Sequence, residues 1–144
     1  MAAGTPPLFD FDVSKYFTQF NQFKLPGFDV DALMAAQRKN IEAITAANQV
    51  ALEGVGTLVR RQSEIARKAV ESYTAAVNEL IAEGSVEAKA AKQADLAKGA
   101  YDSALANAKE LADIATKTRD EAFGVINARV REGLDEVSAM VAKK

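Results

Sequence analysis

Residues 30–81 read VDALMAAQRKNIEAITAANQVALEGVGTLVRRQSEIARKAVESYTAAVNELI. Apolar residues recur in this stretch at intervals of three, four and four, an eleven-residue repeat of about 3.67 residues per turn. That period nearly matches a straight α-helix, so the stretch predicts one long helix with a continuous apolar stripe. The aliphatic positions that we expect to form a binding or oligomerisation stripe are Val30, Leu33, Ile41, Ile44, Leu52, Val55, Val59, Val70, Val77 and Ile81. The repeat also contains Ala66 and four polar, uncharged positions, which are Gln37, Asn48, Ser63 and Thr74.

The composition excludes several classes of function. The chain has 144 residues and a net charge of −2, which argues against a nucleic-acid binder because such proteins need clustered Lys and Arg. It contains no Cys and no His, so disulfides, thiolate metal sites and imidazole catalysis are not expected. The first residues lack the basic start and apolar run of a signal peptide, and no window reaches the ~20 apolar residues of a membrane span. We therefore expect a cytoplasmic protein without a transmembrane segment.

Aromatic residues are concentrated near the N-terminus, where six of the seven phenylalanines fall within residues 1–28. A loose tail is expected first, followed by a short amphipathic helix that ends at Pro26-Gly27. The residues that would share the apolar face of this helix are Val13, Tyr16, Phe17 and Phe20. The sequence thus predicts two regions, residues 1–28 and residues 29–144.

A second long helix is predicted after the first. Asp29 is the expected N-cap of the first long helix, while Gly84 and Ser85 are expected to cap the turn between the two. The second helix should span about residues 86–142, with an alanine-rich first half and a more apolar last third. The predicted fold is all-α: a short aromatic helix followed by a long antiparallel, coiled-coil-like hairpin. Two such rods cannot enclose a core, so we expect oligomerisation or contact with another apolar surface.

No pattern in the sequence indicates catalysis. The Gly-x-Gly of residues 54–56 has neither a preceding strand nor a third glycine, so its glycines are interpreted as flexure sites in the helix. The Asp-x-Asp pairs of residues 10–12 and 29–31 precede helices and are better explained as caps than as metal ligands. The basic pairs Arg60-Arg61 and Arg67-Lys68 indicate a solvated charged face, or contact with an anionic lipid or acidic partner. We expect a protein with no enzymatic activity, no cofactor and no bound metal.

Three segments resemble the phasin family, the small proteins that coat bacterial polyhydroxyalkanoate (PHA, including PHB) storage granules. They are residues 23–33 (FKLPGFDVDAL), 36–43 (AQRKNIEA) and 47–54 (ANQVALEG). The resemblance covers roughly residues 20–75; beyond them the chain agrees only in being long, alanine-rich and helical. It implies a non-enzymatic coat protein on the surface of cytoplasmic granules, a homo-oligomer, with granule enzymes as potential partners.

The resulting hypothesis is a coat protein whose apolar helix faces bind the polyester and whose charged faces prevent granule coalescence. Two alternatives remain open at this point. One is a cytosolic coiled-coil scaffold or chaperone-like holdase that does not bind polymer, because stripes of this kind commonly form coiled-coil cores. The other is a desiccation protectant of the eleven-residue repeat type, against which the aliphatic content argues.

Overall fold

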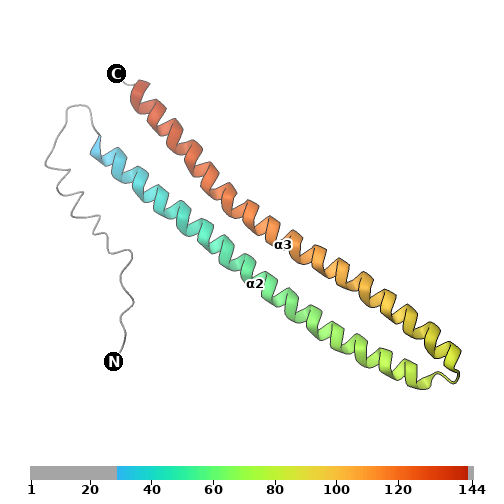
Figure 1. Ribbon diagram of the computed structural model, residues 1–144. Helices are drawn as coiled ribbons and strands as arrows, with labels where there is room; N and C mark the ends of the chain where they lie inside the picture. Colours follow the sequence, from blue (N-terminus) through green and yellow to red (C-terminus); the bar gives the residue numbers. More distant parts are fainter. Residues whose placement is uncertain (1–28, 143–144) are drawn as a thin grey trace, which may run out of the picture. The chain divides into compact units, whose positions relative to one another are not determined.

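Two long helices make up the part of the chain that the structure, a computed structural model, describes, namely residues 29–142. Helix α2 spans Val30–Ala82 (53 residues) and helix α3 spans Val86–Ala142 (57 residues), so each is ~80 Å long (Figure 1). No strand occurs within residues 29–142, which confirms the prediction of an all-α chain with two long helices. The short aromatic helix with Val13, Tyr16, Phe17 and Phe20 lies outside the described residues, and the region boundary at residue 28 stays a prediction.

Cα proximity divides the chain into two units, Met1–Lys39 and Asn40–Lys144, so the division falls within α2. Of the first unit, the structure describes Asp29 and the first turns of α2. The second unit contains the rest of α2, the turn and α3.

Side-chain caps fix where both helices begin. The Asp29 carboxylate accepts a hydrogen bond from the Ala32 backbone N–H at 3.1 Å, and the Ser85 hydroxyl accepts one from Ala88 N–H at 3.1 Å. Each cap satisfies a backbone donor that has no partner within its helix, which stabilises the helix by ~1 kcal/mol. Both N-cap predictions are therefore confirmed. Gly84 does not take a left-handed φ, so the turn at residues 83–85 does not depend on glycine as we had expected.

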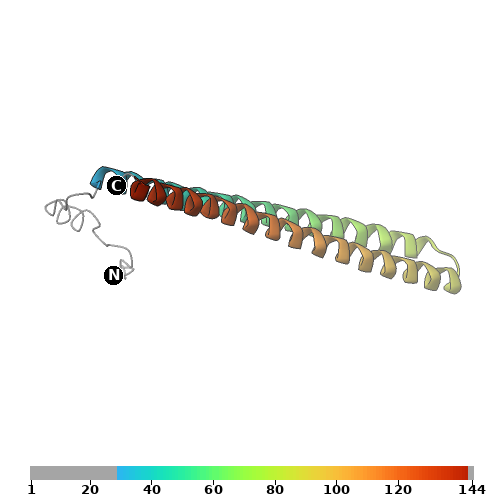
Figure 2. The same cartoon turned by 90° about the horizontal axis from the view of Figure 1, so that it is seen from above.

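Within the second unit, α2 and α3 form an antiparallel hairpin, as Figures 1 and 2 show from two directions. Two ion pairs connect the helices: Arg61 with Glu110, and Glu79 with Lys92 close to the turn. Between them they set the register of one helix against the other. The hairpin predicted from the sequence is thus present in this unit.

Small residues are the most buried part of the contact between the helices, which we call the seam. On α2, Ala47 is 8% exposed and Gly54 is buried, while no large side chain of the described residues is fully buried. Small side chains allow two helices to approach closely but remove little apolar area from water. The half-buried residues that flank them on α2 are Ala43, Val50, Ala51, Leu58, Arg61 and Ile65. The half-buried residues near them on α3 are Glu110, Leu111, Ile114, Thr118, Ala122, Val125 and Arg129.

Gly54 is a contact residue rather than the flexure site expected from the sequence. A Cβ placed on Gly54 would overlap the side chain of Thr118, whereas a Cβ on Gly56 would meet no atom within 4 Å. Helix α2 continues through both glycines without interruption. The first glycine therefore makes room for α3, and the second has no such role in the hairpin.

We predict opposite effects for the same substitution at these two glycines. Gly56→Ala should stabilise the hairpin by ~1 kcal/mol, because alanine is the better helix former and nothing obstructs its methyl group. Gly54→Ala should destabilise it by ~1–3 kcal/mol, because the overlap with Thr118 forces the helices apart.

Thermal unfolding followed by circular dichroism at one protein concentration would measure both changes. Thr118→Gly combined with Gly54→Ala removes the overlapping atoms and should recover part of the loss. Equal stabilisation by Gly54→Ala and Gly56→Ala would contradict the close contact at Gly54.

Candidate surface-binding face

The apolar stripe of α2 is exposed along most of its length. Leu52 is 73% exposed and Val59 is 59% exposed. The other exposed stripe residues are Leu33, Ile41, Ile44, Val55, Val70 and Ile81, while Val30 and Val77 are half-buried. In the second unit, the seam uses a different set of α2 residues. The hairpin therefore leaves the stripe available for another contact.

The stripe lies beside the seam on the surface of α2. Each residue advances about 100° around a helix. Val55 follows the seam residue Gly54 by one position, and Leu52 and Val59 follow Ala51 and Leu58 in the same way. The stripe is thus rotated by about a quarter turn from the contact with α3, in the direction of increasing residue number.

Helix α3 carries an equivalent stripe in its last third. Phe123 follows the half-buried Ala122, and Val130 follows the half-buried Arg129. Phe123 is 60% exposed and Val130 is 56% exposed. Three further exposed residues continue the same spacing toward the C-terminus, namely Leu134, Val137 and Val141.

The antiparallel arrangement places both stripes on the same broad side of the hairpin. Two parallel helices rotated in the same sense from their shared contact would present these stripes on opposite sides. Reversing the direction of one helix reverses its sense of rotation, so the two stripes converge on one side. We call this side the apolar face, and within the second unit its main residues are Ile41, Ile44, Leu52, Val55, Val59, Phe123 and Val130.

The opposite broad side, which we call the charged face, has a different composition. Residues that precede the seam by one position include Glu53, Arg60 and Glu64 on α2, and Lys117 and Glu121 on α3. Exposed ion pairs join neighbours on the charged side of each helix, such as Lys117 Nζ with Glu121 Oε1 at 3.8 Å. The hairpin consequently separates most apolar from most charged side chains across its thickness; Arg119, which follows the seam residue Thr118 and pairs with Asp120, is a charged residue on the apolar side.

The two cations that pair across the seam, Arg61 and Lys92, have raised pKa values. Arg61 donates hydrogen bonds to Glu110 at 2.7 Å and to Glu64 at 3.0 Å, and these bonds raise its pKa above the ordinary value of an arginine. A hydrogen bond to Glu79 likewise raises the pKa of Lys92 above 10.5. Because both shifts are upward, their contribution to stability is present at neutral pH and would be lost only on raising the pH through these values.

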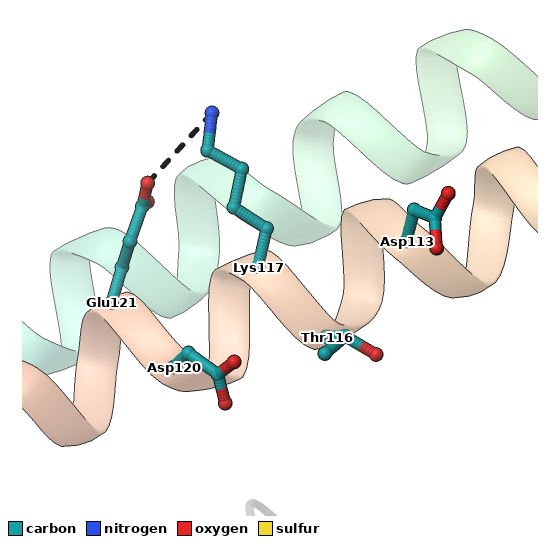
Figure 3. Close-up of a pocket in the computed structure, with 5 residues that line it drawn as sticks. All are labelled: Asp113, Thr116, Lys117, Asp120 and Glu121. Carbon is teal, nitrogen blue, oxygen red and sulfur yellow. Dashed lines mark ion pairs between the residues drawn. The ribbon is translucent and has the colours of Figure 1, made fainter.

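The described residues offer little to a small ligand. An open depression on α3 is lined by Asp113, Thr116, Lys117, Asp120 and Glu121. In Figure 3, Lys117 and Glu121 extend together from one side of the helix, while Thr116 and Asp120 lie on the other side of its ribbon. Within residues 29–142, no group of three His, Cys, Asp or Glu is placed to hold a metal ion. Neither described helix is long and apolar enough to cross a membrane.

The stripe predicted from the sequence comprises only the α2 half of the apolar face, although the last third of the second helix was also predicted to be more apolar. The α3 residues follow spacings of three and four, the same signal that identified the α2 stripe. That the seam uses Ala47 and Gly54 instead of the aliphatic stripe was not predicted from the sequence. Small residues at helical spacing were the available signal for that contact.

Comparison with protein-family models gives a match to the phasin protein family over residues 31–130. The chain belongs to the phasin family. The match confirms the resemblance seen in the sequence and extends it over most of α3. Phasins are non-catalytic structural proteins associated with polyhydroxyalkanoate granules. Comparison of this phasin with curated proteins and with solved structures gives no match.

Proposed function

We propose that this phasin coats polyhydroxyalkanoate granules by laying the apolar face of its hairpin on the polyester. The observation that carries the proposal is the convergence of two exposed aliphatic stripes, from α2 and α3, on one side of the hairpin. A single stripe would bind along a line, whereas two stripes side by side form a surface. Family membership supplies the second support, since phasins are granule-associated proteins.

The free energy of binding would come from removing apolar side chains from water. The apolar face contains side chains that are 55–73% exposed, such as Ile44 and Leu52. Burying the exposed part of each would contribute on the order of 1 kcal/mol. The sum of several such contributions exceeds the free-energy cost of immobilising one hairpin by only a moderate amount. Adsorption would therefore be firm yet reversible.

The charged face would then point into water and oppose coalescence. Granules would otherwise lower their apolar surface by merging. A layer of hairpins replaces that surface with Lys, Arg, Asp and Glu side chains, which hold water and exclude a second apolar surface. The granule surface in the cytoplasm is accordingly the proposed location, with other copies and granule enzymes as further partners.

The rival function is a scaffold or holdase whose apolar face contacts only protein. Both functions would require the same exposed side chains. They differ in whether bare polyester competes for the apolar face.

We predict that Leu52→Asp combined with Val55→Asp lowers affinity for polyester particles at least ~10-fold. The substitutions remove two aliphatic contacts and place two carboxylates where they must lose water on adsorption. Adsorption to beads of polyhydroxyalkanoate, measured as bound protein against free protein, would give the affinities.

The matched control is Ala46→Asp combined with Thr57→Asp, which adds the same charge at exposed α2 positions on the opposite, charged face. It should adsorb like the unmodified chain. Equal losses in both variants would assign the effect to net charge. If the unmodified chain bound no polyester while Leu52→Asp with Val55→Asp only changed its oligomeric state, the scaffold function would replace the coat function.

We also predict one-sided burial on the polymer. The chain contains no Trp, so a single Trp reports on its own position. The emission of Val55→Trp should shift to shorter wavelength when polyester particles are added, because the indole leaves water. The emission of Thr57→Trp, on the charged face, should stay unchanged; a shift of equal size at both positions would contradict a hairpin lying flat.

A further inference from the structure

The outer edge of each helix, the side that faces away from the other helix, carries charges in a definite order. On α2, Arg60 lies between the apolar-face residue Val59 and the seam residue Arg61 in sequence, which places it where the outer edge meets the charged face. Arg67 and Glu71 continue along the same edge as an ion pair with 3.8 Å between Nε and Oε1, and their side chains are 73% and 66% exposed. Seven and eleven residues are close to two and three full helical turns, so these three side chains lie along one line.

The outer edge of α3 carries a matching line of opposite charges. It consists of Lys109, Asp113 and Asp120, all of them exposed. Asp120 also accepts hydrogen bonds from its neighbour Arg119 within the same helix. Asp113 and Asp120 also line the open depression on this helix, and Figure 3 shows Asp120 on the side of the ribbon opposite to Lys117 and Glu121. The depression is therefore part of an acidic edge and not a ligand pocket.

The two lines have the same spacing when they are read in opposite chain directions. Arg60, Arg67 and Glu71 are separated by seven and then four positions. Asp120, Asp113 and Lys109 are also separated by seven and then four positions. Two helices that run antiparallel with these edges in contact would therefore pair Arg60 with Asp120, Arg67 with Asp113, and Glu71 with Lys109 at the same time.

We propose that a second copy of this chain binds along these edges, so that adsorbed hairpins associate side by side. This inference rests on the proposed function, because hairpins lying on one surface with the apolar face down have only their outer edges free to meet. The α2 edge of one copy contacts the α3 edge of the next. Because the two contacting edges differ, the association does not close and can extend as a row.

The pairing also sets a stagger between neighbours. Inside one hairpin Arg61 is opposite Glu110, whereas between copies Arg60 is opposite Asp120. The neighbouring copy is thus displaced by about nine residues, or ~13 Å, along the helix axis.

Surface confinement makes such weak contacts effective. An exposed ion pair contributes little between molecules that diffuse freely. Copies held on one surface at a common height meet at high effective concentration, so three simultaneous pairs suffice to order them. The contact should be strong at ~0.01 M salt and lost at ~1 M, where the screening length is ~3 Å.

Charge reversal at each edge tests this contact. One variant, Arg60→Asp with Arg67→Asp, makes both edges acidic, and the other, Asp113→Arg with Asp120→Arg, makes both basic. Gly84→Cys supplies a unique site for donor or acceptor dyes, since the chain has no Cys and Gly84 has open space around it. Energy transfer between copies on polyester beads, at low and equal coverage, reports lateral contact.

With either variant alone, energy transfer should fall to the level expected for randomly placed copies. A mixture of the two variants should regain the signal, because acidic edges then meet basic ones. The four substitutions in one chain should also restore it, and this variant has the net charge of the unmodified protein. Persistence of the signal in Asp113→Arg with Asp120→Arg alone would overturn the inference and point to contact between two α2 edges.

Adsorption at low coverage separates this inference from the proposed function. All charge variants should adsorb like the unmodified chain, because none alters the apolar face. Normal adsorption with unchanged energy transfer in every variant would contradict the lateral contact but not the coat function. Failure of the unmodified chain to adsorb would contradict the coat function itself.

Discussion

The close contact of Gly54 with Thr118 determines how the two helices of the hairpin are rotated. A larger residue at either position would turn or separate the helices and bring other side chains to the seam. With the glycine in place, α2 presents its small residues to α3 and keeps its aliphatic stripe outside. The exposure of Leu52, Val55 and Phe123 is thus a consequence of a contact in which none of them takes part.

The seam combines weak packing with specific pairing. Alanine and glycine provide little apolar burial and would tolerate a slip of one turn along the helix axis. The ion pairs Arg61–Glu110 and Glu79–Lys92 oppose such a slip, because each cation would lose its partner. Ion pairs of this kind contribute more to register than to stability. The hairpin therefore has a defined alignment without a large core.

Much of this architecture could be predicted from the sequence. Which face of α2 contacts α3, and which face stays exposed, could not. The eleven-residue repeat, Asp29 and Ser85 placed both helices and the turn correctly. The repeat could not show whether the stripe would face α3, because an apolar stripe satisfies a partner helix and an external surface equally well. That choice depends on the steric fit at Gly54, a residue that the sequence alone indicates only as a flexure site. The position of the α3 stripe could be assigned only after the seam was known.

The ladder-like arrangement of contacts in the hairpin also bears on how it folds. Glu79 and Lys92 are close in sequence, while Arg61 and Glu110 are further apart, so contacts grow steadily less local away from the turn. Loop closure is cheapest at the turn, and each pair formed there brings the next within reach. In a newly made chain, contacts between the helices would form first near residues 83–85 and then progressively further from the turn. In the folded hairpin, the segments furthest from the turn would exchange their amide protons first.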